Sequence, residues 1–220
     1  MKKVAVILAG SGVYDGSEIH EAALTLLYLD KVKAEIKCFA PDKNQLHVIN
    51  HLQGEPVEGE NRNVLLESAR IARGEVLPLP ELKVDDFDAV IFPGGFGAAK
   101  NLCTFAVDGP DCEIDGDVNR IVNDTVEKKK VLGVICISPV IAARALKDSG
   151  RKPKLTVGTD KGTMEALEKL NAEPVEARVN EIVVDENNKI VSTPAYMLGP
   201  SIAPVAEGIE KLVNKVIDMA

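Results

Sequence analysis

The sequence predicts an α/β fold in which helices cover both faces of a largely parallel sheet. Short apolar segments alternate with amphipathic ones along most of the 220 residues, a pattern typical of strands joined by crossover helices. The segment 131–136 has no polar face, as expected for a central parallel strand covered on both sides. Because aromatic residues make up 4% of the chain and tryptophan is absent, Val, Ile, Leu and Ala should fill the core. This length suits a single domain over residues 1–220.

The strands are expected where short apolar runs are bounded by polar or glycine-rich segments. The predicted strands cover 4–8, 35–39, 89–92, 131–136, 155–157, 181–184 and 189–192. Asp185 to Asn188 is a turn sequence, so the last two strands should form an antiparallel hairpin added to the parallel sheet.

The helices are expected where apolar residues recur with helical spacing. The predicted helices cover 18–30, 64–73, 116–130, 140–147, 164–171 and 201–219. Ser17 is the expected N-cap of the first helix, and Asn61 to Asn63 should open the second. His47 and His51 are expected in a further helical stretch, at the surface.

Composition excludes several classes of protein. The net charge is −8, which argues against a nucleic-acid partner because phosphate binding needs a basic patch. No apolar stretch approaches membrane-spanning length. The four cysteines form no CxxC pair, so a structural metal site is not expected. Free thiols favour a reducing compartment, and the cytoplasm is the expected location.

Cys136 is the candidate centre of chemistry. It stands where an apolar strand runs into a helix, and Pro139 suits the first turn of that helix. Unpaired amides and the positive end of the helix dipole at such an elbow favour the nucleophilic thiolate. The alternative is a small, buried, structural cysteine.

In open sheets of this kind, sites form at the carboxyl ends of the strands. That rule selects four segments, which are 10–21, 93–102, the Cys136 elbow and 193–197. The amides of Gly94, Gly95 and Ile137 are the expected donors to a developing oxyanion beside the thiolate. A phosphate-binding loop is the competing interpretation, but the glycine patterns do not complete a nucleotide-binding motif.

The segment 10–21 supplies possible acids and bases. Glu18 and Glu21 are three residues apart and hence on one face of a helix, where a carboxyl that meets Cys136 would act as general acid or base. First-turn carboxylates are also favoured by the helix dipole alone. His20 is the one histidine expected near the pocket, and Asn101 belongs either to the pocket or to the surface.

Several motifs together resemble a known family. Gly16 to Glu21, Phe92-Pro93-Gly94-Gly95 and Gly133 to Cys136 resemble the ThiJ/PfpI superfamily, whose class I glutamine-amidotransferase-like fold is flavodoxin-like. Longer segments resemble its ElbB branch, described as isoprenoid biosynthesis proteins with an amidotransferase-like domain. These segments are Gly12 to Glu21, Gly94 to Leu102, Val157 to Asp160 and Thr193 to Leu198.

The resemblance implies a cofactor-free glyoxalase that converts glyoxal or similar small dicarbonyls to hydroxy acids. Cys136 would be the nucleophile and Glu21 the facing carboxylate, with Glu18 as second candidate and neither metal nor cofactor needed. Where protease-like members have a histidine after the cysteine, this chain has Ile137. Protease or glutaminase activity is therefore not expected unless His20 supplies the base.

A second class of function stays open from the sequence. The chain could be a non-catalytic or redox-responsive binding protein in which oxidation of Cys136 changes partner contacts. A regulatory link to isoprenoid metabolism is suggested only by the family's name. The resemblance also implies a homodimer, although no sequence feature identifies an interface.

Overall fold

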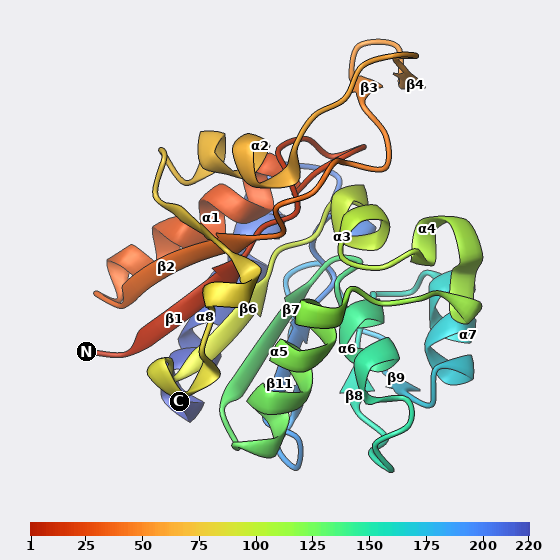
Figure 1. The fold of residues 1–220 in the computed structure, drawn as a ribbon. Helices are drawn as coiled ribbons and strands as arrows, with labels where there is room; N and C mark the ends of the chain where they lie inside the picture. Colours follow the sequence, from red (N-terminus) through yellow and green to blue (C-terminus); the bar gives the residue numbers. More distant parts are fainter.

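A seven-stranded sheet forms the centre of the molecule (Figure 1). The computed structural model describes residues 1–220. Every neighbouring pair of strands is parallel except the antiparallel β10–β11 pair. This confirms the predicted flavodoxin-like sheet with its added hairpin. The strand order is β10 (Val183–Asp185), β11 (Ile190–Thr193), β7 (Val131–Ile135), β6 (Ala89–Phe92), β1 (Lys3–Ile7), β2 (Glu35–Ala40) and β5 (Val76–Pro78).

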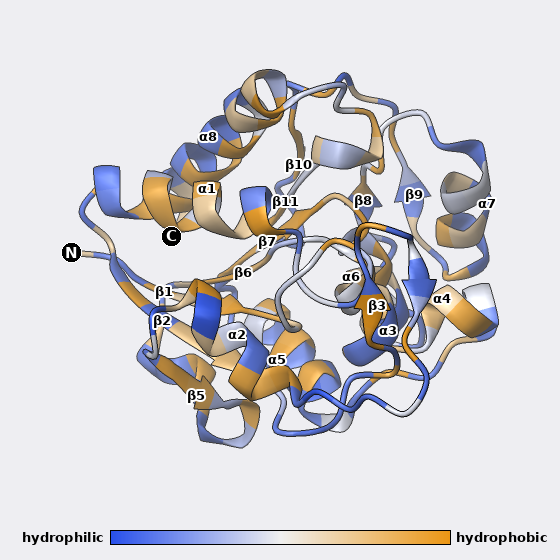
Figure 2. Ribbon diagram, turned by 90° about the horizontal axis from the view of Figure 1, so that it is seen from above, coloured by the Kyte–Doolittle hydropathy of each residue, from blue (hydrophilic) through white to orange (hydrophobic).

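Helices lie on both sides of the sheet, as Figures 1 and 2 show. None of them combines the length and the apolar composition that a membrane-spanning helix needs. Four short 3₁₀ turns complete the chain, among them η3 (Gly109–Asp111) and η4 (Ala195–Met197). The helices are α1 (Ile19–Lys31), α2 (Val64–Ile71), α3 (Phe96–Asn101), α4 (Phe105–Asp108), α5 (Gly116–Glu127), α6 (Pro139–Leu146), α7 (Lys161–Lys169) and α8 (Ile202–Met219).

The alternation of side chains along β1 divides the core into two layers. Val4 and Val6 pack in one layer with side chains of α1, α2 and α8. Ala5 and Ile7 pack in the other layer with side chains of α5 and α6. Because both layers are apolar, the central strands are continuous hydrophobic runs, as expected for a parallel sheet that is covered on both faces.

Some predicted elements differ from the structure. The predicted strand 155–157 is β8 (Lys154–Leu155), which pairs with β9 (Glu173–Pro174) outside the main sheet. The edge strand β5 was not predicted, because three residues are too few to show alternation. Ser17 does not cap α1. Its hydroxyl accepts the Ala9 amide, and the carboxylate of Glu18 is the cap, accepting the Glu21 amide at 2.7 Å.

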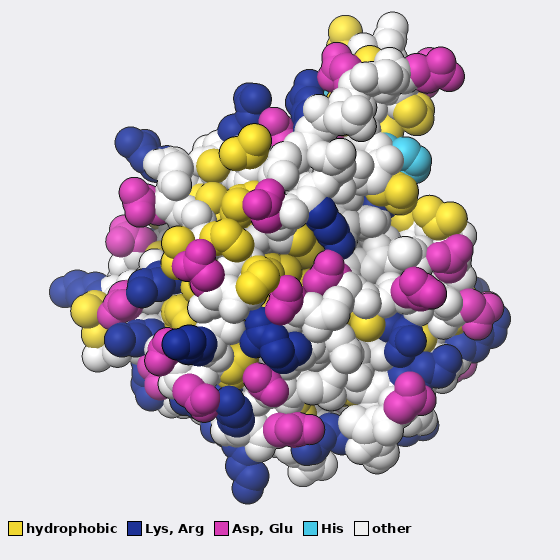
Figure 3. Space-filling view, in the orientation of Figure 1, with side chains coloured by type: hydrophobic (Ala, Val, Ile, Leu, Met, Phe, Trp, Pro, Cys, Tyr) yellow, Lys and Arg dark blue, Asp and Glu magenta, His cyan; other side chains and the backbone are white.

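The predicted helix around His47 and His51 is wrong. This region holds the two-residue strands β3 (Ile49–Asn50) and β4 (Glu55–Pro56), which form a hairpin that projects from the body (Figures 1 and 3). The buried carboxylate of Asp15 accepts the Ile49 amide at 2.8 Å. A long-range hydrogen bond therefore ties the hairpin to the loop after β1, and local periodicity carries no sign of it.

The loops after β1 and β6 pack backbone against backbone. The Gly97 amide donates to the Gly16 carbonyl at 2.9 Å. A Cβ atom at Gly97 would collide with the backbone of Gly16. Glycine is thus required where α3 begins, and this contact fixes the loop that carries Gly94 and Gly95 against the loop that leads into α1.

We expect Gly97→Ala to lower the free energy of unfolding by about 1–3 kcal/mol, the cost typical of overpacking. Urea denaturation followed by circular dichroism measures this change. Gly116→Ala is the matched control, because no atom lies within 4 Å of a Cβ atom added there at the start of α5. Its effect should stay below about 1 kcal/mol, and equal losses for the two variants would contradict the packing argument.

Candidate active site

Cys136 lies at the sharp turn between β7 and α6. Its φ angle is +61°, a left-handed conformation that is strained for a residue other than glycine. The Cys136 amide donates to the Thr193 carbonyl at 3.0 Å, and the Ser138 hydroxyl donates to the Pro93 carbonyl at 2.7 Å. Bonds to the two neighbouring strand ends therefore hold this backbone in place.

Two glycines bring the loop after β6 against the thiol. A side chain at Gly94 would collide with Cβ of Cys136 and Oε2 of Glu21. Gly95 has φ +98°, and its missing side chain leaves room for the backbone of Gly16 to Glu18. The Gly94 carbonyl accepts the Glu18 amide at 2.9 Å, so the same loop also anchors the start of α1.

Glu21 is completely buried beside Cys136. Its Oε2 accepts the Gly94 amide at 2.9 Å, and its Oε1 accepts the Tyr196 amide at 3.1 Å. Two backbone donors from different loops thus orient the carboxyl next to the sulfur. Of the two carboxylates that the sequence left open, Glu21 is the one that faces the thiol.

Burial dominates the protonation of this pair. Loss of water contact raises the pKa of Glu21 to about 8, a rise to which the nearby charge of Glu18 adds and which the amides of Tyr196 and Gly94 oppose. Burial and the charge of Glu21 also raise the pKa of Cys136 above its usual range. The backbone amides at the elbow favour the thiolate as expected, but desolvation outweighs them and the net shift is upward.

The amides of Gly95 and Ile137 are directed at the sulfur of Cys136 and lower its pKa. Free backbone amides beside a nucleophile are the kind of donor that stabilises a developing oxyanion. The Gly94 amide is not available for that role, because it already donates to Glu21. Of the three amides predicted as oxyanion donors, those of Gly95 and Ile137 therefore lie beside the thiol, and that of Gly94 binds Glu21 instead.

Glu18 and His20 lie at one side of the pocket. Glu18 is 8% exposed, lines the cavity and caps α1 through its hydrogen bond to the Glu21 amide. The imidazole of His20 is about half exposed, and its Nδ1 is 2.8 Å from the Tyr196 hydroxyl. It is not among the residues that line the cavity.

Asn101 has a structural position, which differs from the predicted pocket role. Its Nδ2 donates to the carbonyls of Ala9 and Asp15, each at 2.9 Å. Its Oδ1 accepts the Leu46 amide at 3.0 Å. The Nδ2 end fixes the loop after β1 and the Oδ1 end fixes the segment after β2, so both ends of this buried amide are used and Asn101 is not among the residues that line the cavity.

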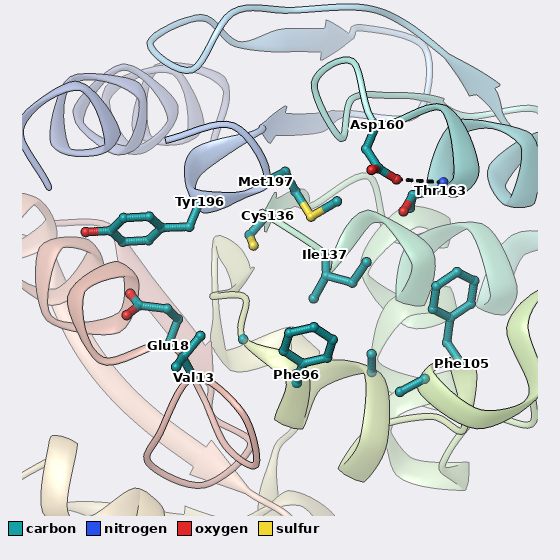
Figure 4. A pocket seen from close by; sticks show the side chains of 13 residues that line it. Val13, Glu18, Phe96, Phe105, Cys136, Ile137, Asp160, Thr163, Tyr196 and Met197 are labelled. Atoms are coloured by element: carbon teal, nitrogen blue, oxygen red, sulfur yellow. Dashed lines mark hydrogen bonds between the residues drawn. The ribbon is translucent and has the colours of Figure 1, made fainter. Parts of the chain in front are cut away.

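A cavity of about 380 Å³ opens above Cys136 (Figure 4). The four predicted segments all contribute to it, through Val13, Gly95, Cys136 and Tyr196 among others. No group of three or more His, Cys, Asp or Glu side chains is arranged to hold a metal ion. Sequence reasoning missed the lining residues Phe105, Ala106, Asp160 and Thr163, since α4 and α7 come from outside the strand-end loops of the main sheet.

Comparisons place the chain among known proteins. A scan against protein-family models finds no match. The chain is 46% identical over 99% of its length to the human mitochondrial glutamine amidotransferase-like class 1 domain-containing protein 3, of which it covers 83%. It is 35% identical over 88% of its length to the zebrafish (Danio rerio) mitochondrial ES1 protein, of which it covers 76%.

These relatives correct the expected location. Both are named as mitochondrial proteins, which contradicts an assignment to the cytoplasm alone. That expectation rested on free cysteines, and all four cysteines are indeed unpaired. A reduced thiol indicates a reducing environment but cannot distinguish one reducing compartment from another.

Solved structures share the fold. An isoprenoid biosynthesis protein with an amidotransferase-like domain from Ehrlichia chaffeensis superimposes with a TM-score of 0.93 at 39% identity, covering 100% of this chain and 99% of that one. Glyoxalase III from Candida albicans has a TM-score of 0.65 at 17% identity, covering 99% and 97%. The second likeness concerns the fold alone. Because the chain is 35–46% identical to the mitochondrial relatives over 88–99% of its length, it belongs to the family of class 1 glutamine amidotransferase-like proteins that includes the ES1 proteins.

Proposed function

We propose that the protein is a cofactor-free glyoxalase-type enzyme that converts small 2-oxoaldehydes to 2-hydroxy acids. The observation that carries the proposal is the fully buried Glu21 carboxyl beside Cys136, with the amides of Gly95 and Ile137 directed at the sulfur. A nucleophile, a proton carrier and oxyanion donors are the three parts that such a reaction needs.

The first step forms a carbon–sulfur bond. In molecules in which Glu21 is ionised, the sulfur of Cys136 attacks the aldehyde carbon while its proton passes to the Glu21 carboxylate, and the amides of Gly95 and Ile137 stabilise the developing alkoxide. Glu21 then gives that proton to the alkoxide oxygen, which yields a hemithioacetal and restores the carboxylate. A carboxyl with a pKa of about 8 suits this exchange, because general acids and bases work best when their pKa lies near the operating pH.

The second step moves hydrogen between the two carbons of the substrate. Glu21 removes the proton from the carbon bonded to sulfur and a proton is returned to the neighbouring carbonyl carbon. The first carbon is thereby oxidised to a thioester and the second reduced to an alcohol. Water then cleaves the thioester, so glyoxal and one water give glycolic acid and the free thiol, with no external oxidant or reductant.

The alternative of a redox-responsive binding protein has weaker support. Oxidation of cysteine follows its thiolate character and exposure. Cys136 is 8% exposed and burial raises its pKa, which slows reaction with peroxide. A Cys-His hydrolase is also disfavoured, because Ile137 occupies the position after the cysteine and the His20 ring pairs with Tyr196.

Turnover of glyoxal tests the proposal. We expect Cys136→Ala to abolish glycolate formation and Glu21→Gln to lower kcat by about 10²–10⁴-fold, the contribution typical of a positioned acid or base. Cys38→Ala is the control, because Cys38 is a buried thiol on β2 that does not line the cavity. Turnover that persists in Cys136→Ala would remove the mechanism.

The raised pKa of Glu21 predicts a pH-dependent stability. The folded protein keeps this proton up to about pH 8, whereas the unfolded chain releases it near the ordinary value of 4.5. The contribution of Glu21 to stability therefore falls as the pH rises between these values, by at most about 1.4 kcal/mol per pH unit.

Glu21→Gln removes that titration. The difference in free energy of unfolding, variant minus wild type, should increase from pH 5 to pH 8 in urea denaturation. Any constant offset from the altered hydrogen bonds cancels in the slope. A difference that is flat with pH would mean that Glu21 is already ionised in the folded protein.

A further inference from the structure

The cavity continues away from the thiol as an apolar trough. Its walls include Phe96 of α3, Phe105 of α4, Ile137 after β7 and Met197 of η4. Figure 4 shows Glu18 and Tyr196 on one side of Cys136, and Phe105, Thr163 and Asp160 on the other, beyond Ile137. A substrate bound at Cys136 thus has an apolar space beside its reacting carbon.

The charges of the trough have one sign. Glu18 and Asp160 are the charged residues among the thirteen that line the cavity, and no Lys, Arg or His is among them. Hydrogen bonds from Thr163, whose amide lies 2.9 Å from Oδ1, lower the pKa of Asp160. A substrate that carries a carboxylate or phosphate would meet a like charge and find no cation to pair with it.

Glyoxal is small for this space. It has four non-hydrogen atoms, whereas pockets of about 300–1,000 Å³ hold drug-sized ligands, and the cavity measures about 380 Å³. Bound glyoxal would leave the apolar walls in contact with water. An aryl or alkyl group there would displace that water and gain about 25 cal/mol for each Å² of apolar surface buried.

Resting on the proposed function, we infer that the preferred substrate is an uncharged 2-oxoaldehyde whose ketone carbon carries an aryl group or an alkyl chain longer than methyl, seated between Phe105, Ile137 and Met197. The chemistry is unchanged. The aldehyde carbon is oxidised to a carboxyl group, the ketone carbon is reduced to an alcohol, and one water is consumed. With phenylglyoxal the product is mandelic acid.

Three substrates separate the effect of the size of the arm from the effect of its charge. Phenylglyoxal has the apolar arm, 4-carboxyphenylglyoxal has the same shape with a negative charge, and glyoxal has no arm. We expect kcat/KM for phenylglyoxal to exceed that for each of the others by about tenfold or more, the range typical of pocket discrimination. Turnover of glyoxal at an equal or higher kcat/KM would overturn the inference and leave the glyoxalase proposal standing.

A matched pair of variants tests whether the residues that line the trough discriminate between neutral and charged arylglyoxals. Ala106 lines the cavity, whereas Val107 is next to it on α4, is 64% exposed and does not line it. Ala106→Lys should raise the relative kcat/KM for 4-carboxyphenylglyoxal, since it adds a cation to the trough. Val107→Lys makes the same change in net charge outside the cavity and should leave the ratio of the two arylglyoxals unchanged. Equal effects of both variants would contradict the assignment.

A second readout does not depend on turnover. Phenacyl bromide and 4-carboxyphenacyl bromide alkylate thiols and differ only in the charge on the arm. Peptide mass spectrometry should find Cys136 modified faster by the neutral reagent, with the preference reduced in Ala106→Lys and kept in Val107→Lys. If no 2-oxoaldehyde is turned over, the proposed function fails, and this ratio still decides whether the trough selects neutral apolar arms.

Discussion

The structure of the site depends on the burial of one carboxyl group. Glu21 has no contact with water, and its oxygens are held by the Gly94 and Tyr196 amides. A buried carboxyl group without hydrogen-bond partners would cost several kcal/mol, so these two loops must be placed accurately for the fold to tolerate it. The requirement explains the glycine at 94, because any side chain there would displace either the carboxyl or the thiol.

The shape of the cavity follows from the topology of the sheet. The carboxyl ends of β1, β6, β7 and β11 lie along one edge, and the loops that follow them supply the thiol, the amides and the carboxyl. The outer wall comes from α4, which contributes Phe105, and from the start of α7, where the N-cap Asp160 lies. The inner part of the site therefore holds the reactive groups, and the outer part sets what can reach them.

Local signals in the sequence were sufficient to place the elbow and the four loops of the site. The apolar run of β7 followed by Pro139 identified the elbow, and the strand-end rule identified the four loops. The sequence could not decide between Glu18 and Glu21, because both lie on one face of α1 and only tertiary packing brings Glu21 to Cys136. It also left Asn101 open between the pocket and the surface, since nothing local shows that its side-chain amide binds the backbone of Ala9, Asp15 and Leu46.

The long separation of the Glu21 partners along the chain has a consequence for synthesis. Glu21 is synthesised first, Gly94 and Cys136 follow, and the Tyr196 amide comes 175 residues after Glu21. A nascent chain that has not yet passed η4 cannot contain the complete environment of the carboxyl. The environment of the carboxyl is therefore complete only after β11 and η4 have both been synthesised, and a product that terminates before η4 would lack the Tyr196 donor.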